Sequence, residues 1–331
     1  MKKELLDLLA CPECGSVELV LNHSAEESLT CARCNACYPV RNGIPQMLPN
    51  PLATSLQLTE TYREKLRASI LQGEAEARPE PPNPEVDRFM WEQELYCWGK
   101  EVIYKDSKAA EIFSSYSEQG ARRLCQFIIA RANGVQGKSL LYVGSGNDRL
   151  VTLPLEEEGA FVVNLDIAPE PLEDLMQAGA KSCVCGDARR LPFRADAFDV
   201  VFSKGSIHHS HPIDQPLRAM ARVAKSGGHI IVAEPGKHVL SRPPRVLSPS
   251  GLGYPTPYED AISTREVIDI LNNEGISQLE VAALTHAPPG VTPLIARLWE
   301  SLGKAMPWLF RRFAFEFIVY GRKGGPTRAI L

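Results

Sequence analysis

Five short apolar runs in the middle of the chain constrain its fold more than any other feature. They are SLLYVG (139–144), FVVNLDI (161–167), SCVCGD (182–187), FDVVFSKG (198–205) and HIIVAEPG (229–236). Each run has the length of a buried strand, and successive runs begin 16 to 31 residues apart, which leaves room for helices between them. The alternation predicts an α/β fold in which a mostly parallel sheet carries helices on both faces. Such sheets bind ligands at the carboxyl ends of their strands.

The polar residues that end these runs indicate an adenosine site. Gly144 and Gly146 open a glycine turn after the first run, but no third glycine completes the fingerprint of a nicotinamide dinucleotide site. Asp166 ends the second run 22 residues after Gly144, where a carboxylate can accept hydrogen bonds from both ribose hydroxyls. Asp187 closes the third run and can accept from an exocyclic amine such as that of adenine.

The motifs VGSG, NLDI, CGDARRLPFRADAFDVVFSKGSIHH and RAMARVAKSGGHIIVAEPG resemble successive motifs of the class I S-adenosylmethionine-dependent methyltransferases. The resemblance spans Asp87 to Lys323, and LPF (191–193) with IHH (207–209) is most similar to the small-molecule branch. It implies a doubly wound, mostly parallel, Rossmann-like sheet of seven strands, with FIVYGRK (317–323) inserted antiparallel as the last strand. It also implies S-adenosylmethionine as the cofactor.

The same resemblance implies a set of cofactor-binding residues: Gly144, Ser145, Gly146, Asp148, Asp166, Ile167, Asp187, Ala188 and Ser203. In this scheme the glycines let the backbone approach the methionine part, Asp166 holds the ribose, and Asp187 with Ala188 holds the adenine. The sequence departs from the family where Tyr142 replaces an acid and Asp148 replaces the third glycine. Asp148 either supplies the missing carboxylate for the methionine amino group or caps the next helix.

Two adjacent histidines follow the fourth run, at the rim where a methyl acceptor would lie. Methyl transfer needs a base only when the acceptor must lose a proton, and an imidazole titrates in the useful range. His208 and His209 are therefore the candidate catalytic residues. The alternative is that both histidines are packing residues of a turn.

Two C-x2-C pairs near the N-terminus indicate a metal site. Cys11 with Cys14 and Cys31 with Cys34 are separated by 16 residues whose alternation predicts a hairpin. Four thiolates at this spacing can surround one zinc ion, and a closed set of four makes the metal structural rather than catalytic. We expect the fifth cysteine, Cys37, to be a packed thiol.

Residues 4–49, with YPVRNGIP after the second cysteine pair, resemble the small zinc-ribbon proteins that bind and activate methyltransferases in eukaryotes, and their short bacterial relatives. The resemblance implies a module that binds a protein partner. Residues 1–50 carry four Lys and Arg against six Asp and Glu, so the module lacks the positive footprint of an RNA binder.

The chain is expected to divide into a zinc ribbon (1–50), a helical and Pro/Glu-rich linker (51–85), a methyltransferase domain (86–324) and a short tail (325–331). A formal net charge of -4 does not point to nucleic acid as a partner. No export signal and no apolar stretch of about 18 residues is evident, so we expect a cytoplasmic location.

Two further segments are of functional interest. A Pro- and Gly-rich stretch at 237–258 is expected to cover the site as a substrate-contacting loop, with surface decoration as the alternative. Residues 292–313 are expected to form a basic amphipathic helix whose apolar face packs against the core, with peripheral membrane contact left open; that face consists of Leu294, Ile295, Trp299, Leu302 and Met306.

The sequence as a whole favours an enzyme that transfers a methyl group from S-adenosylmethionine to a small or lipid-like acceptor, with a structural zinc ion in a separate ribbon. Two alternatives remain open. One is a methyltransferase acting on bases of ribosomal or transfer RNA, because some such enzymes also carry a cysteine zinc module. The other is an inactive interaction protein, in which Tyr142 and Asp148 mark a decayed cofactor site. The oligomeric state is not indicated.

Overall fold

The computed structural model describes residues 1–23, 26–49, 88, 107–236, 262–286, 293–306 and 314–324. Three predicted features lie outside these residues: the linker helix with its Pro- and Glu-rich continuation, the loop at 237–258, and the tail. The predicted domain boundaries therefore stay predictions.

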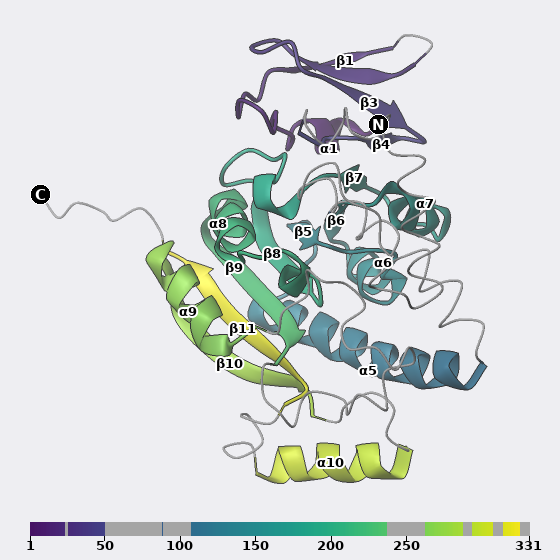
Figure 1. Cartoon of the computed structure of the whole chain (residues 1–331), viewed down its shortest axis with the longest axis vertical. Coiled ribbons are helices and arrows are strands. Elements are labelled where there is room, and N and C mark those ends of the chain that lie inside the picture. The colour runs from purple at the N-terminus through teal and green to yellow at the C-terminus, as the bar shows by residue number, and fades with distance from the viewer. Residues whose placement is uncertain are drawn as a thin grey trace, which may run out of the picture.

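A seven-stranded sheet forms the centre of the molecule (Figure 1), in the order β10-β11-β9-β8-β5-β6-β7. Its strands are β5 (Ser139–Val143), β6 (Phe161–Asp166), β7 (Cys183–Cys185), β8 (Phe198–Lys204), β9 (Ala224–Pro235), β10 (Ile276–Thr285) and β11 (Glu316–Lys323). Across the sheet from β9 through β8, β5 and β6 to β7, neighbouring strands pair in parallel. Strand β11 lies antiparallel between β9 and β10. The five apolar runs and the predicted antiparallel last strand are thereby confirmed.

Helices cover both faces of this sheet because successive side chains of each strand point to opposite sides. Leu140 and Tyr142 of β5 join one buried cluster with α5 and α6, whereas Leu141 and Val143 join another with α8 and α9. The described helices of this region are α5 (Ser107–Arg131), α6 (Arg149–Glu157), α7 (Pro169–Gln177), α8 (Asp214–Val223), α9 (Thr264–Asn273) and α10 (Pro293–Ala305), with short 3-10 turns η3 (Ala188–Arg190) and η4 (Ile207–His209). The predicted doubly wound fold is confirmed.

One strand gave no clear signal in the sequence. β10 has a mixed burial pattern rather than a continuous apolar run, because it forms the outer edge of the sheet. Its pairing with β11 shifts register near Gln278, which has a positive φ of 54°. An irregular, half-exposed edge strand lacks the periodicity that identifies the central strands.

The N-terminal residues form a separate four-stranded antiparallel sheet in the order β1-β2-β3-β4. The strands are β1 (Leu19–Asn22), β2 (Ser28–Cys31), β3 (Cys37–Arg41) and β4 (Ile44–Pro45), and the short helix α1 (Lys3–Leu6) precedes them. The pairing of β1 with β2 confirms the hairpin predicted between the cysteine pairs. Cys37 is exposed, so the prediction of a packed thiol is wrong: this cysteine begins β3 with its side chain on the solvent side.

This small unit, hereafter the ribbon, packs against the β7 edge of the large sheet (Figure 1). The backbone N–H of Met47 donates to the carbonyl of Cys185 at 2.7 Å. A second strip pairs Leu9 with Phe193 in antiparallel fashion, where Ala10 N–H donates to Pro192 and Arg194 N–H donates to Leu8. Residues 185–194 are thus held by the ribbon at both ends, and we call this paired contact the clasp.

The clasp is apolar as well as hydrogen-bonded. Leu9, Met47 and Phe193 are each at most 1% exposed and belong to one continuous buried cluster that also reaches α8 and α9. Burying side chains of this size contributes roughly 1.5 to 3 kcal/mol each relative to leaving them exposed. The ribbon therefore contributes side chains to the main hydrophobic core.

Among the helices that the structure describes, none combines the length and the apolar character needed to cross a membrane.

We predict that Leu9→Ala destabilises the whole chain, because it removes a buried side chain at the clasp and leaves a cavity. Large-to-small changes of this kind cost roughly 2 to 5 kcal/mol. Thermal unfolding followed by circular dichroism measures the effect. Val17→Ala is the matched control, since Val17 lies in the same ribbon but is 60% exposed. Equal unfolding temperatures for the two variants would contradict the packing described here.

Candidate functional site

A cavity of ≈ 960 Å³ opens at the carboxyl ends of β5, β6 and β8. All the predicted cofactor-binding residues line it except Ser203, which is fully buried within β8. The hydroxyl of Ser203 has no hydrogen-bond partner among the described residues. Ser203 therefore supports the strand from inside rather than the cavity wall.

The glycine turn after β5 forms the floor of this cavity. Gly144 has a positive φ of 66°, and a Cβ built at this position would collide with the side chain of Ser206. Ser206 Oγ in turn donates to the carbonyl of Val143 at 3.0 Å. Only glycine fits between the first strand and this serine, so the turn brings bare backbone to the cavity.

Asp166 lies at the end of β6 with both carboxylate oxygens fixed by backbone groups. Oδ2 accepts from Gly146 N–H at 2.8 Å and Oδ1 accepts from Ala168 N–H at 3.0 Å. These two bonds orient the carboxylate at the cavity that Asp166 lines. The glycine turn and the acid are therefore connected directly.

Asp187 is hydrogen-bonded within its own turn. Its carboxylate accepts from the backbone N–H of Arg189 at 2.8 Å and from the guanidinium of the same residue, with Nη2 to Oδ2 at 2.7 Å. Asp187 is 4% exposed and caps the turn η3. An adenine amine would have to share this carboxylate with Arg189.

The two departures from the family pattern are bonded to each other. Tyr142 Oη donates to Asp148 Oδ2 at 2.9 Å, and Lys204 Nζ contacts the same oxygen at 3.3 Å. Asp148 stands at the N-cap position of α6, but its side chain makes no capping bond. The helix-capping alternative for this side chain is therefore wrong, and the carboxylate is directed to the cavity instead.

Burial and charge act together on this group. Burial raises the pKa of the Tyr142 phenol well above its ordinary value, and the carboxylate of Asp148 raises it further. For Lys204, burial lowers the pKa, but the carboxylates of Asp148 and Glu316 outweigh burial and raise it. A neutral tyrosine, a carboxylate and a charged lysine thus line one end of the cavity.

The histidine pair is arranged by a buried acid that the sequence analysis did not single out. Glu234, at the end of β9, accepts from Ser206 N–H and Ile207 N–H through Oε1 and contacts His208 Nδ1 at 2.7 Å through Oε2. His209 lines the cavity, whereas His208 is not among its lining residues and lies behind, with ring centroids 4.2 Å apart. The two candidate catalytic residues therefore occupy different positions.

Lys204 and Arg88 also line the cavity, although sequence reasoning assigned them no role. Arg88 is 8% exposed and donates through Nη1 to the carbonyl of His211 at 3.0 Å, and through Nη2 to the carbonyl of His209. The position of Lys204 just after an apolar run was a signal that could have identified it. Arg88 precedes the sheet by about 50 residues, and nothing in its local pattern links it to the site.

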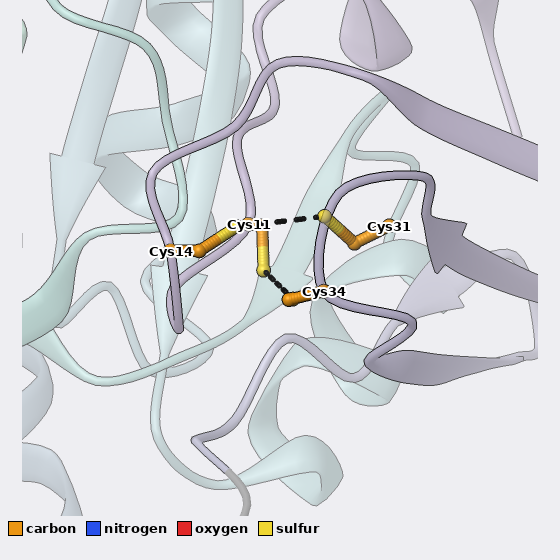
Figure 2. Close-up of side chains that lie close together, drawn as sticks. All are labelled: Cys11, Cys14, Cys31 and Cys34. Atoms are coloured by element: carbon orange, nitrogen blue, oxygen red, sulfur yellow. Dashed lines mark hydrogen bonds between the residues drawn. The ribbon is translucent and has the colours of Figure 1, made fainter.

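A second candidate site lies in the ribbon, where Cys11, Cys14, Cys31 and Cys34 converge (Figure 2). The sulfur atoms all lie within 4.8 Å of one another, with Cys11 to Cys34 and Cys14 to Cys31 each at 3.6 Å. Ligands about 2.3 Å from a tetrahedral zinc ion are about 3.8 Å apart, so the cluster has suitable dimensions for that metal.

The surroundings of the cluster favour the thiolate at Cys31 but not at every member, because burial and the neighbouring sulfur atoms outweigh a backbone hydrogen bond and raise the pKa of Cys34 to about 12. Burial raises the pKa of Cys31, but hydrogen bonds from the backbone N–H groups of Cys34 and Arg33 outweigh it and lower the pKa to about 7. Tyr38 Oη contacts Cys11 Sγ at 3.1 Å from below the cluster. Thiolate is the form that binds a metal ion.

A glycine turn with acids at the ends of neighbouring parallel strands, on a seven-stranded sheet with one antiparallel insertion, defines a nucleoside-binding domain of the methyltransferase type. The family models agree. Residues 141–232 match the family described as methyltransferase domain, and residues 2–43 match the family described as Trm112p-like protein. The chain therefore carries a region that matches methyltransferase domains behind a region that matches Trm112p-like proteins, which confirms both resemblances.

Curated relatives match only parts of the chain. A demethylmenaquinone methyltransferase from Corynebacterium glutamicum is 34% identical over 101 residues, 30% of this chain and 42% of the relative. A ubiquinone biosynthesis O-methyltransferase from Vibrio atlanticus is 25% identical over 176 residues, 49% of this chain and 73% of the relative. A bifunctional biotin biosynthesis protein from Cellvibrio japonicus is 36% identical over 103 residues, 30% of this chain and only 20% of the relative.

Two solved structures are similar at low identity. The complex of the Haloferax volcanii Trm112 methyltransferase activator with a putative methyltransferase gives a TM-score of 0.46 at 17% identity, covering 66% of this chain and 98% of that one. A magnesium protoporphyrin IX methyltransferase from Synechocystis gives 0.49 at 16% identity, covering 73% and 100%.

We predict that Gly144→Ala destabilises the fold more than backbone strain alone explains, because its Cβ collides with Ser206. Gly137→Ala is the matched control: Gly137 has a similar φ of 69° but open space around it. The strain should cost about 1 kcal/mol in both variants, and the collision about 1 to 3 kcal/mol more in Gly144→Ala. Chemical denaturation measures both. Adding Ser206→Gly should restore most of the difference, and a lack of rescue would argue against the collision.

Proposed function

We propose that this chain is an S-adenosylmethionine-dependent methyltransferase whose acceptor is a small or lipid-like molecule, and that its ribbon holds a structural zinc ion. The observation that carries the proposal is the single cavity that brings the glycine turn, Asp166 and the group around Asp148 to the carboxyl ends of adjacent strands. The dimensions of that cavity suit one nucleoside-sized ligand together with part of an acceptor.

In this proposal the adenosine part lies along β6 and β7. Asp166 accepts from the ribose hydroxyls while Gly146 and Ala168 hold its carboxylate in place. Backbone groups at Asp187 and Ala188 border the adenine, since the Asp187 side chain is already bonded to Arg189. Ile167 supplies apolar contact beside the ring, and Ser145 belongs to the turn.

The methionine end is held by opposite charges. The Asp148 carboxylate accepts from the α-ammonium group and takes over the role of the acid that Tyr142 replaced. Lys204, whose Nζ lies 3.3 Å from Asp148 Oδ2, offers its positive charge to the α-carboxylate. Charge-assisted bonds of this kind are stronger than neutral ones and fix the donor's orientation.

The cofactor supplies an already reactive methyl sulfonium, so the chain's task is to orient the acceptor and exclude water. His209 faces the cavity at the place where an acceptor would lie, and we assign it the role of base for acceptors that must lose a proton. His208, fixed by Glu234, positions the turn and does not reach the acceptor.

The acceptor class rests on two considerations. The names of two curated relatives refer to menaquinone and ubiquinone, which are lipid-like molecules, although the chain matches only part of each relative. The ribbon has more acidic than basic residues, which disfavours RNA as the substrate. A protein partner for the ribbon is also proposed, on the strength of the Trm112p-like match.

We predict about one tightly bound zinc ion per purified chain. Replacing Cys31 and Cys34 together by Ser should abolish the metal and lower the unfolding temperature, because the site then lacks two of its four ligands. Cys37→Ser is the matched control, since Cys37 is an exposed cysteine of the same ribbon outside the cluster. Elemental analysis decides the matter. Zinc retained by the double variant would refute the site.

We predict that the chain binds S-adenosylmethionine and that Asp166→Asn weakens this binding by tenfold to a hundredfold. Losing charge-assisted hydrogen bonds to the ribose costs roughly 1.5 to 3 kcal/mol. Asp196→Asn is the control, because Asp196 is an exposed acid paired with Lys323 and remote from the cavity. Isothermal titration calorimetry measures both. No binding by the unchanged protein at millimolar cofactor would favour an inactive interaction protein.

The same protein tests the acceptor class. Labelled methyl from the cofactor should enter an organic-solvent extract of cells and not their total RNA. Asp166→Asn should lower the transfer in proportion to its weaker cofactor binding at subsaturating cofactor. Stable label in RNA and none in the extract would support an RNA methyltransferase instead.

A further inference from the structure

Helix α10 presents apolar side chains to solvent in the described part of the chain. Leu294 is 78% exposed and Leu298 is 60% exposed, and they lie one helical turn apart on the same side. Arg297 is exposed beside them. We call these three residues the outer face of α10. It contradicts the sequence-based expectation that Leu294 packs against the core.

The opposite side of the helix is anchored, so the outer face cannot simply turn inward. Glu300 is 9% exposed, and its carboxylate contacts Arg123 Nη1 at 2.7 Å and accepts from His286 N–H at 2.9 Å. Gly303 packs so closely on the His286 ring that a Cβ would collide with it. These contacts fix the rotation of α10 about its axis.

The segment that contains α10 has a net positive charge. Residues 292–313 contain four basic residues, Arg297, Lys304, Arg311 and Arg312, and a single acid, Glu300. That acid is already neutralised by Arg123. An exposed apolar pair within a positively charged segment complements a surface that is both apolar and anionic, which describes a bilayer with acidic headgroups.

A second copy of the chain is a less suitable occupant. In a twofold symmetric dimer the same patch faces itself, so Arg297 would approach its own copy. Repulsion between like charges disfavours such a contact.

Helix α10 also lies at the end of the sheet where the ligand cavity opens. It belongs to the connection between β10 and β11, and in the sheet Thr285 pairs with Glu316, which pairs with Pro235 at the carboxyl end of β9. In Figure 1, α10 lies beyond these strand ends, at the far end of the molecule from the ribbon. The parallel strands open their ligand cavity at the same edge of the sheet.

We propose that α10 docks this protein on the surface of an anionic lipid bilayer. Leu294 and Leu298 enter the boundary between headgroups and acyl chains, and Arg297 pairs with lipid phosphate. Docking is independent of methyl transfer. The further consequence, that the enzyme meets a lipid-like acceptor at the bilayer, rests on the proposed function.

The test uses the full-length protein and sedimentation with two kinds of vesicle: phosphatidylcholine alone, and phosphatidylcholine mixed with phosphatidylglycerol. We expect binding to the mixed vesicles and much weaker binding to the neutral ones. Leu294→Glu with Leu298→Glu should lower the partition coefficient on mixed vesicles by at least about tenfold. Arg297→Gln should lower it by about fivefold on mixed vesicles and leave binding to neutral ones unchanged.

The matched control is Val17→Glu with Val20→Glu, which places the same two acids on exposed apolar positions of the ribbon, 60% and 54% exposed. We expect this control to bind vesicles nearly as well as the unchanged protein, apart from the general effect of added negative charge. Equal losses in the two double variants, or no binding of the unchanged protein to mixed vesicles, would overturn the proposal.

Two further measurements separate the remaining explanations. Size-exclusion chromatography with light scattering should give the same mass for the unchanged protein and the α10 double variant, whereas a dimer that the variant dissociates would assign the outer face to a second copy. Cofactor binding by calorimetry should be the same in both, since α10 residues do not line the cavity. A failure of docking with intact cofactor binding would thus reject this inference and leave the proposed function standing.

Discussion

The clasp, in which the ribbon holds residues 185–194 at both ends, joins the ribbon and the large sheet through one buried cluster. It covers the backbone of β7, which would otherwise be an open edge of the large sheet and a template for aggregation. It also fixes the segment that carries Asp187 and Ala188 on the wall of the cavity. Ala10, which bonds to Pro192, is the immediate neighbour of Cys11 in the cysteine cluster. The cysteine cluster and the cavity wall that carries Asp187 are therefore a few bonds apart.

The pairing of Tyr142 with Asp148 joins the two residues that depart from the family pattern. Taken separately, a missing acid and a missing third glycine each suggest a decayed site. The structure brings them into one hydrogen-bonded group with Lys204, at the end of the cavity where the family pattern places its acid. A buried tyrosine needs a partner for its hydroxyl, and Asp148 provides that partner while keeping its charge at the cavity.

The central strands and the cysteine cluster could be predicted because they depend on local patterns. Apolar runs ending in Gly144 or Asp166 and paired cysteines carry their signal within a few residues.

Other features could not be predicted from local patterns. β10 was not predicted because an edge strand with mixed exposure has no clear hydrophobic period. Leu294 was misassigned because helical spacing identifies a face but not the direction in which that face points. The role of Glu234 depends on contacts with residues nearly 30 positions earlier, which no local pattern encodes. The cellular location and the roles of the cavity residues stay predictions.

The clasp joins two units that belong to one polypeptide, and this has a stoichiometric consequence. When a ribbon and a catalytic domain are separate proteins, the fraction that is paired falls on dilution and depends on how much of each is made. A tether replaces that concentration dependence with a fixed effective concentration. The contacts at Leu9 and Met47 can then be modest in area and still be formed in nearly every molecule. Each catalytic domain carries its own ribbon, whatever the expression level or the presence of competing partners.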